Sequence, residues 1–406
     1  MDEFSYRMVE RKEIEMRLRL LIPSGVIGLV LLAGNGMAQS KKTPIRIGAI
    51  HNITGSLGSI GQPSLNGALL AAKQLNEHGG VLGRPLELVV RDGQSDPAVV
   101  AAITRELVHM PHMAAITGLN DTEMALAAAP LAEKGRMVFL TSGATSPKVP
   151  LQFPRFYFMA CFGDNTQAGA GAEYALGALG VKTAWLLFDD TTDFTVLLAS
   201  YFKERYTALG GEILGEDTYA GGALDFSEQI ARILALPTFP DMLYVSAGPD
   251  DIGRLVKQMR ESGLDQPILG GDGYDTPLLV ETAGAAAHDT YFTTHVFLDP
   301  SQAPPVVRQF IADYESEYGV PPETAFAALA YDAVILLASA IERADSAKQK
   351  DIAGALELTE DFPRVTGSIS FAPAVHIPDK EVTIVHIVGD KRTLAMVIQP
   401  QEVPRP

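Results

Sequence analysis

Cysteine is nearly absent from this sequence: among its 406 residues, only Cys161 carries a thiol. A single cysteine excludes an intrachain disulfide framework and any metal site built from several thiolates. We therefore expect stability to come from core packing, and a chain of this length can bury a substantial core.

Basic residues are also few. Lysine and arginine total 32 against 49 aspartates and glutamates, so the net charge is −17. Nucleic-acid binding depends on clustered lysine and arginine, and the sequence contains no basic run. We therefore expect no nucleic-acid partner. Hydrophobic residues make up 47% of the chain, which indicates a globular protein rather than a disordered one.

The signature motifs of common catalytic sites are missing as well. The sequence contains no G-x-S-x-G nucleophile turn, no G-x-x-x-x-G-K-[ST] phosphate loop, no H-E-x-x-H zinc motif and no EF-hand loop. We expect no catalytic residue, no metal site and no cofactor. A binding protein is therefore a better expectation than an enzyme.

Only one long apolar run occurs, at residues 20–33. Arg17 and Arg19 precede it and Gly36-Met37-Ala38 follows it, which is the layout of a secretory signal peptide. The run is short for a membrane span of about 20 residues. We expect residues 1–38 to be removed and the product to be free in the periplasm, without stable membrane insertion. A membrane anchor is the alternative reading, and Met16 is an alternative start.

Strand-like and helix-like segments alternate from Ile45 onward. Short apolar runs at residues 45–50, 86–90 and 114–117 are each followed by a segment with helical spacing of apolar side chains. A second series begins near Gln167. This alternation predicts an α/β fold with two lobes, each a parallel sheet flanked by helices. Ligands of such folds bind outside the carboxyl ends of the strands, so a cleft between the lobes is the expected site.

Several short motifs carry a family resemblance because they occur in a fixed order and spacing. They are Asn52-Ile-Thr-Gly-Ser-Leu-Gly-Ser-Ile-Gly61, Asn76-Glu-His-Gly-Gly-Val-Leu-Gly-Arg84, Asp92-Gly-Gln-Ser-Asp-Pro97, Thr141-Ser-Gly-Ala-Thr-Ser-Pro147 and Leu269-Gly-Gly-Asp-Gly273. Over residues 45–398 the chain resembles the branched-chain amino-acid (Leu/Ile/Val) binding protein family. These proteins are the type I periplasmic substrate-binding proteins of ABC transporters.

The resemblance implies two similar lobes joined by three crossing segments, with hinge closure over the ligand. Carried onto this chain, the crossings fall near Met159–Gly163, Thr293–Val296 and Arg364–Gly367. The implied N-terminal lobe comprises residues 44–161 and 296–364, and the C-terminal lobe comprises residues 162–295 and 365–406.

The turn formed by Ser142, Gly143, Ala144 and Thr145 is the first candidate part of the site. Its small residues leave backbone N–H groups exposed after a strand, which suits an anionic oxygen. The resemblance implies that this turn holds a ligand α-carboxylate. The alternative is that Ser142 or Thr145 only caps a helix.

The next candidate is the loop containing Asp121 and Thr122, where the family usually has a serine that shares the carboxylate. Thr122 can donate in the same way. Asp121 would repel a carboxylate, so either its side chain points away or the ligand offers a donor there.

Asp272 stands where the family places an acid for the ligand ammonium, and a carboxylate is a suitable partner for a buried cation. The alternative is a glycine-flanked surface turn.

Four further positions complete the expected site. Ile60 and Phe194 stand for the aromatic wall of the family, with Phe194 shifted by one residue. Gly248 aligns where some amino-acid binders have tyrosine. His51 either hydrogen-bonds the ligand or only ends a strand. Together these changes predict a wider and more polar cleft than a leucine receptor uses.

The resemblance therefore implies a monomeric receptor that binds a small amino-acid-like or carboxylate- or amide-bearing solute and delivers it to the permease subunits of an ABC importer. The alternative is a periplasmic ligand sensor that feeds a signalling partner.

Overall fold

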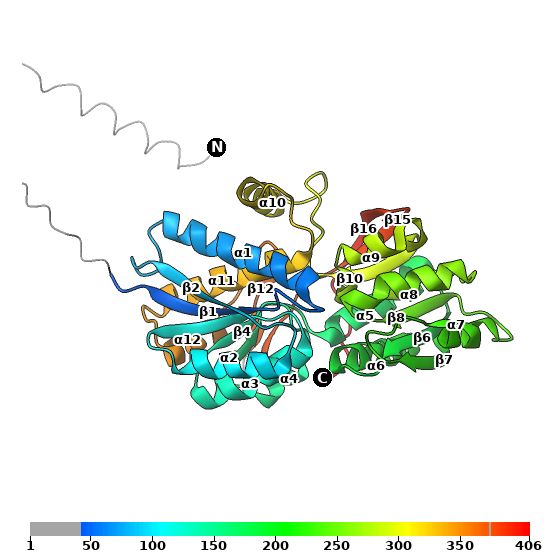
Figure 1. Ribbon diagram of the computed structural model, residues 1–406, viewed down its shortest axis with the longest axis horizontal. Helices are drawn as coiled ribbons and strands as arrows, with labels where there is room; N and C mark the ends of the chain where they lie inside the picture. The colour runs from blue at the N-terminus through cyan, green and yellow to red at the C-terminus, as the bar shows by residue number, and fades with distance from the viewer. Residues whose placement is uncertain (1–41, 373–374) are drawn as a thin grey trace, which may run out of the picture. The chain divides into compact units, whose positions relative to one another are not determined.

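Two sheets organise the chain. The computed structural model describes residues 42–372 and 375–406, and the predicted signal peptide at residues 1–38 lies outside them. The first sheet has five parallel strands in the order β2-β1-β3-β4-β5 (Figure 1). Its strands are β1 (Ile45–His51), β2 (Leu86–Asp92), β3 (Met113–Gly118), β4 (Phe139–Thr141) and β5 (Tyr157–Met159).

The second sheet has seven strands in the order β16-β15-β10-β9-β8-β6-β7. They are β6 (Thr183–Asp189), β7 (Glu212–Tyr219), β8 (Met242–Ser246), β9 (Ile268–Gly270), β10 (Thr290–Thr294), β15 (Val382–Val388) and β16 (Lys391–Ile398). The first five are parallel, whereas β15 pairs antiparallel with β10 and β16 pairs antiparallel with β15. The predicted parallel sheet is thus extended at one edge by an antiparallel hairpin. Gly389, at φ 66°, permits the tight hairpin between these last two strands.

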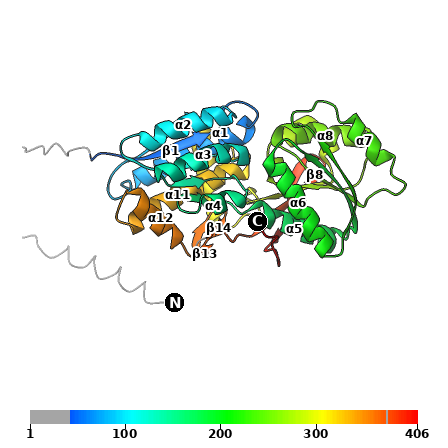
Figure 2. The same ribbon diagram turned by 90° about the horizontal axis from the view of Figure 1, so that it is seen from below.

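Helices cover both faces of each sheet (Figures 1 and 2). The helices packed with the first sheet are α1 (Gly58–Glu77), α2 (Pro97–His109), α3 (Thr122–Gly135), α4 (Lys148–Gln152), α10 (Pro305–Tyr318), α11 (Ala325–Arg343) and α12 (Gln349–Glu357). Those packed with the second sheet are α5 (Asp164–Tyr174), the π-helical η1 (Ala175–Leu179), α6 (Asp193–Ala208), α7 (Ser227–Leu234), α8 (Pro249–Glu261), α9 (Leu278–Ala283) and the 3₁₀ turns η2 (Asp272–Tyr274) and η3 (Gly284–Ala287).

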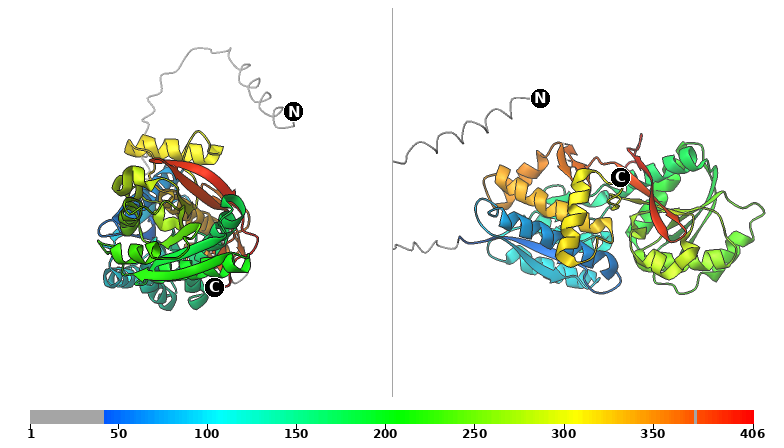
Figure 3. Two further views of the ribbon diagram at one scale, coloured as in Figure 1. Left: turned by 90° about the vertical axis from the view of Figure 1, so that its right-hand side faces the viewer. Right: turned by 90° about the horizontal axis from the view of Figure 1, so that it is seen from above.

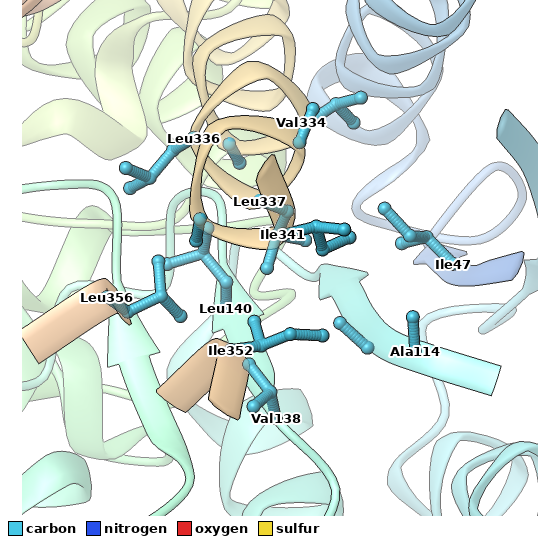
Figure 4. Close-up of a cluster of buried hydrophobic side chains, with 14 of the residues drawn as sticks. Ile47, Ala114, Val138, Leu140, Val334, Leu336, Leu337, Ile341, Ile352 and Leu356 are labelled. Carbon is cyan, nitrogen blue, oxygen red and sulfur yellow. The ribbon is translucent and has the colours of Figure 1, made fainter. Parts of the chain in front are cut away.

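Each sheet separates two apolar cores because strand side chains alternate between its faces. In the first sheet, Val138 and Leu140 join the core under α11 and α12, whereas Phe139 joins the core under α2 and α3. Figure 4 shows Leu140 near Leu337 of α11 and Val138 next to Ile352 of α12. The same alternation holds for β8, where Leu243 and Tyr244 enter different cores.

Helix α11 is long and apolar enough to cross a membrane by length and composition, but most of it is buried inside the first lobe. The backbones of α11 and α1 lie in close contact. A Cβ atom at Gly67 of α1 would lie 1.9 Å from the carbonyl oxygen of Ala327, so glycine is required there. This contact explains one of the small residues in the first helical segment.

Two short hairpins follow α12, namely β11 (Phe362–Arg364) with β12 (Gly367–Ile369) and β13 (Phe371–Ala372) with β14 (Val375–Pro378). Ile369 and Phe371 enter the core of the first lobe, and Nδ1 of His376 lies 2.8 Å from the carbonyl oxygen of Tyr157 in β5. Residues 365–372 and 375–378 therefore pack with the first sheet. The sequence assigned them to the second lobe because an apolar strand pattern does not say which sheet the strand joins.

We accordingly place the third crossing at residues 379–381, after β14, instead of Arg364–Gly367. Lys380 lies in this crossing, and its Nζ donates to the carbonyl oxygen of Ala160 at 3.1 Å in the first crossing. In the right-hand view of Figure 3 the red C-terminal strands lie where the two lobes join. The other lobe boundaries stay predictions.

Strand β7 is the one long strand that the sequence analysis missed. It reads Glu-Ile-Leu-Gly-Glu-Asp-Thr-Tyr, with three acids among eight residues. It is the edge strand of its sheet and is only partly buried, so it lacks the apolar run that marks β6 and β8.

Candidate functional site

A cavity of about 350 Å³ lies between the two lobes at the carboxyl ends of their strands. From the first lobe, the start of α1, the loop between β3 and α3, and Thr145 contribute to its wall. From the second lobe, the loops that follow β6, β7, β8 and β9 contribute. Both walls are therefore built from strand-to-helix loops, which is where ligands of open α/β sheets bind.

Seven of the eleven residues singled out from the sequence line this cavity. They come from both lobes, and four of them carry a hydroxyl or a carboxylate. The seven are Ile60, Asp121, Thr122, Thr145, Phe194, Gly248 and Asp272.

The other four lie behind the cavity wall. Oγ of Ser142 donates to Oδ1 of Asn120 at 2.7 Å, and so it braces the neighbouring loop. A Cβ atom at Gly143 would lie 2.8 Å from the ring of Phe326, which leaves room only for glycine. The carbonyl oxygen of Ala144 accepts a hydrogen bond from Sγ of Cys161. These three residues shape the turn but do not face the cavity.

His51 is the fourth residue outside the cavity. Its side chain is fully buried, and neither ring nitrogen has a hydrogen-bond partner in the described part of the chain. Burial lowers its pKa from 6.5 to about 4. The structure therefore places His51 in the core at the end of β1, away from the cavity.

Thr145 lines the cavity without capping a helix. The next helix, α4, begins at Lys148 after Pro147, and no side chain caps it. The alternative reading, in which Ser142 or Thr145 serves only as a helix cap, does not describe this turn.

The structure resolves how Asp121 and Thr122 differ. The carboxylate of Asp121 caps α3, because Oδ1 accepts a hydrogen bond from the backbone N–H of Met124 at 3.2 Å. Burial nevertheless raises the pKa of this carboxyl group. Thr122 is the first residue of α3, and its hydroxyl is buried without a hydrogen-bond partner among the residues that the structure describes. A buried hydroxyl without a partner is the group that a ligand would satisfy.

Asp272 is buried at the opposite wall. Oδ1 accepts from Nε2 of Gln167 at 2.9 Å, and Oδ2 lies 3.1 Å from Nε2 of His295. Oε1 of Gln167 in turn accepts from the hydroxyl of Thr293 at 2.6 Å. Asp272 is only 2% exposed, so the surface-turn alternative is wrong. Its carboxylate is held at a fixed position beside the cavity.

The sequence analysis missed three carboxylates of the second lobe. Asp189 ends β6, and Asp250 and Asp251 begin α8 after β8. Asp189 is the last residue of a strand, and Asp250 and Asp251 follow one, so the expectation that ligands bind at strand ends could have found them. The loop at Gly221 and Gly222 was missed because β7 was missed.

The cavity is strongly acidic. Its lining contains five aspartates and no lysine, arginine or histidine. Two more acids, Asp164 and Glu123, lie beside it. Burial and the charge of Asp272 raise the pKa of Asp164 well above its usual range. Burial and the nearby Asp121 raise the pKa of Glu123 to about 8. Among the described residues, no cluster of His, Cys, Asp or Glu has the arrangement needed to hold a metal ion.

Direct hydrogen bonds connect the two lobes around the cavity. A carboxylate oxygen of Glu123 in α3 accepts from the backbone N–H of Asp193 in α6. On the hinge side, Oδ2 of Asp275 accepts from the backbone N–H of Ala325 at 2.9 Å. The lobes thus contact each other on both sides of the site.

A family model described as periplasmic binding protein matches residues 44–392, which is most of the chain. The chain belongs to the periplasmic binding protein family. The predicted resemblance and the two-lobed α/β fold of this family are thereby confirmed.

Relatives in this family include amino-acid receptors. The chain is 26% identical over 342 residues to the Leu/Ile/Val-binding protein BraC3 of Rhizobium johnstonii, which covers 84% of this chain and 91% of the relative. The structure of the present chain is similar to that of the leucine-binding protein LivK of Thermotoga maritima. The TM-score is 0.81 at 31% identity, and the match covers 88% of this chain and 99% of that chain.

A second solved structure is the branched-chain amino acid transporter substrate-binding protein LivJ of Streptococcus pneumoniae in complex with isoleucine. Its TM-score is 0.82 at 29% identity, with 88% of this chain and 100% of that chain covered. These relatives are substrate-binding proteins, which agrees with the expectation of a binding protein rather than an enzyme.

Proposed function

We propose that this chain is the soluble receptor of an ABC importer and binds a small solute with amino-acid-like, carboxylate or amide groups between its lobes. The observation that carries the proposal is the cavity itself. It is enclosed by strand-end loops of both lobes, with Thr122 and Thr145 on one wall and Asp272 on the other. The named relatives, which include Leu/Ile/Val-binding proteins, support an amino-acid-like ligand.

The polar groups fit the two ends of a zwitterion. The Thr122 hydroxyl lacks a partner and can donate to a ligand carboxylate, and Thr145 adds a second hydroxyl. Asp272 accepts from an ammonium group, since each carboxylate oxygen can take more than the one bond that the protein supplies. A few charge-assisted hydrogen bonds with closure would supply a dissociation constant of about 1 μM, or roughly −8 kcal/mol.

Closure of the lobes is part of this proposal. The crossing segments act as the hinge, and the hydrogen bond from Asp193 to Glu123 forms only when α3 and α6 approach each other. A ligand that contacts both walls therefore favours the closed form over the open form.

The closed receptor binds the permease of the importer as its partner. It does so in the periplasm, as a monomer. A periplasmic sensor that presents the closed form to a signalling protein is the alternative function. The two differ in their genetic neighbourhood: permease and ATPase genes beside this gene favour import, whereas a sensor kinase gene favours signalling.

The test is a thermal-shift screen with amino acids, amides, urea and aromatic or short-chain carboxylates, followed by calorimetry on the hits. A ligand at about 100 times its dissociation constant adds about 2.7 kcal/mol of stability, which is readily measured as a higher Tm. A hit whose affinity falls in Thr122→Val and Thr145→Val supports the proposal. Thr207→Val, at an exposed position of α6, is the matched control. No hit in any class, or hits indifferent to both variants, would sink it.

A further inference from the structure

The acidic end of the cavity in the second lobe has no role in binding a simple zwitterion. Asp189, Asp250 and Asp251 line it together, and no lysine or arginine lines the cavity to balance them. The nearest cation is Arg254, whose Nη1 lies 3.7 Å from Oδ1 of Asp251 and donates to the carbonyl oxygen of Ala223.

Two of these carboxylates are held side by side by one loop. Oδ1 of Asp189 accepts from the backbone N–H of Gly221 at 2.8 Å, and Oδ2 of Asp251 accepts from the backbone N–H of Gly222 at 3.0 Å. Because consecutive Cα atoms are about 3.8 Å apart, two adjacent N–H groups fix the two side chains as neighbours.

Each carboxylate keeps one oxygen free of hydrogen bonds within the described part of the chain. Thr191 donates twice to Oδ1 of Asp189, at 2.8 and 2.6 Å, and no protein donor reaches its Oδ2. Oδ1 of Asp251 is buried without a hydrogen-bond partner, and the residue is only 4% exposed. Burial, reinforced by Asp189 and opposed in part by the Gly222 bond and the charge of Arg254, raises the pKa of Asp251.

Helix capping accounts for part of this cluster but not all of it. Acids in the first turn stabilise the N-terminus of α8, which explains Asp250 and one oxygen of Asp251. It does not explain why a second buried carboxylate, Asp189, faces them, since like charges that share a site destabilise each other. A cation between them would reverse that effect.

The path from Asp272 to this pair is open. Asp272 follows β9 and Asp189 ends β6, two strands away in the sheet, so they are on the order of 10 Å apart along the sheet edge. Gly248 lies between these strand ends, and a Cβ atom there would meet nothing within 4 Å. Phe194 and Pro249 line the cavity between the charged ends and supply apolar surface.

We propose that the ligand is an amino acid whose side chain ends in an ammonium or guanidinium group, with that cation bound by Asp189 and Asp251. This assignment rests on the proposed function, because it uses Asp272 for the α-ammonium group and Thr122 for the carboxylate. The span between the two acidic positions suits a lysine or arginine side chain, and the apolar wall suits its methylene groups. An organic cation is favoured over a metal ion because no metal-binding cluster occurs among the described residues.

The experiment compares ligands that differ only in the distal charge. Calorimetry on the full mature protein measures L-lysine against L-norleucine and L-arginine against L-citrulline. We expect each cationic ligand to bind at least tenfold more tightly than its neutral counterpart. Asp189→Asn and Asp251→Asn retain an oxygen for the loop N–H groups, and each should weaken lysine binding at least tenfold while norleucine affinity stays within twofold.

Two further variants keep the test decisive if an Asn variant loses its fold. Gly248→Val leaves both carboxylates in place, and its φ of −76° and ψ of 168° suit any residue, so it should block lysine while alanine still binds. Asp190→Asn removes an exposed acid that does not line the cavity and should change nothing.

The outcomes separate the two proposals. Equal affinity for lysine and norleucine, binding of leucine alone, or Asn variants that bind lysine normally would overturn the cation assignment and leave the receptor proposal standing. Saturable binding of Ca²⁺ at these carboxylates without any amino acid would also overturn it. If none of the four amino acids binds a protein that melts natively, the cation assignment fails, and the receptor proposal fails with it only if the thermal-shift screen also gives no hit in any class.

Discussion

The side chain of Glu123, in the first turn of α3, accepts a hydrogen bond from the backbone N–H of Asp193, the first residue of α6. The two helices pack on different sheets, so this bond spans the mouth of the cleft. The N-terminus of a helix carries a partial positive charge, which suits an acceptor oxygen. The bond therefore stabilises the closed arrangement of the lobes directly.

Removing this acceptor should open the protein. We expect Glu123→Ala to reduce ligand affinity by about 1–2 kcal/mol, roughly 5- to 30-fold, while the fold stays intact. Glu123→Gln keeps an acceptor oxygen and should bind almost normally. Calorimetry gives the affinities, and solution scattering reports whether the ligand-free Ala variant is more extended. An Ala variant with unchanged affinity and dimensions would show that the bond has no role in closure.

The same pair predicts a pH dependence. Burial and the proximity of Asp121 hold the pKa of Glu123 at about 8, above its ordinary value of 4.5. A carboxyl group whose pKa is raised in the closed form favours that form at low pH, and the benefit is lost as the pH rises through about 8. Ligand affinity should therefore fall from about pH 4.5 to about pH 8 in the wild type and level off above that, whereas it should not fall in Glu123→Gln.

The hydroxyls of Thr122 and Thr145 should each contribute to binding of a carboxylate. Replacing either with valine preserves shape and removes one donor, so we expect a loss of about 1–3 kcal/mol in affinity. Thr122→Val should leave Tm unchanged, because its hydroxyl has no hydrogen-bond partner to lose among residues 42–372 and 375–406. Calorimetry with the best ligand of the screen measures both effects. A change below a few tenths of a kcal/mol would refute the role of that hydroxyl.

Asp272 should select for an amine. Asp272→Asn retains an oxygen to accept from Gln167 but removes the negative charge that an ammonium group requires. We expect at least tenfold weaker binding of amine-bearing ligands and little change for the corresponding deaminated carboxylates. Thermal unfolding monitors the fold. Equal losses for both ligand types would indicate a disturbed wall instead of a missing charge.

His51 makes stability depend on pH. Its pKa is about 4 in the folded protein and 6.5 as the ordinary value, so the unfolded chain takes up the proton first as the pH falls. At about 1.4 kcal/mol per pKa unit, the fold loses roughly 3 kcal/mol between pH 6.5 and 4. Urea unfolding should show this loss in the wild type, and His51→Leu should show a smaller slope over the same range. Parallel slopes in the two proteins would contradict it.

Much of the fold followed from the sequence because parallel α/β units carry a strong local pattern. The apolar run of β8 and the helical spacing in α11 are readable residue by residue. What failed was long-range assignment. The pattern of Ile369 and Phe371 identifies strands but not the sheet that they join. Strand β7 was not recognised because its acidic residues interrupt the apolar run that would mark a strand.

The site was predictable to the extent that strand ends are. The position after a strand led to Thr145, and the family resemblance led to Thr122 and Asp272; all three line the cavity. The position after a strand did not separate Thr145 from Ser142, because the direction of a side chain in a turn depends on packing against Asn120 and Phe326 far away in the sequence. Asp189 was passed over because a turn aspartate resembles ordinary loop chemistry until Gly221 and Asp251 are seen beside it.

The single thiol is a built-in probe of hinge motion. Cys161 lies in the first crossing, fully buried, and its Sγ donates to the carbonyl oxygen of Ala144. Burial raises its pKa well above the usual range, so it reacts only in conformers that expose it. Since the chain has no other cysteine, its rate of alkylation counts openings of the crossing without any engineered label. A saturating solute should lower the alkylation rate of Cys161, and the ratio of the two rates would measure how strongly the bound solute stabilises the closed form.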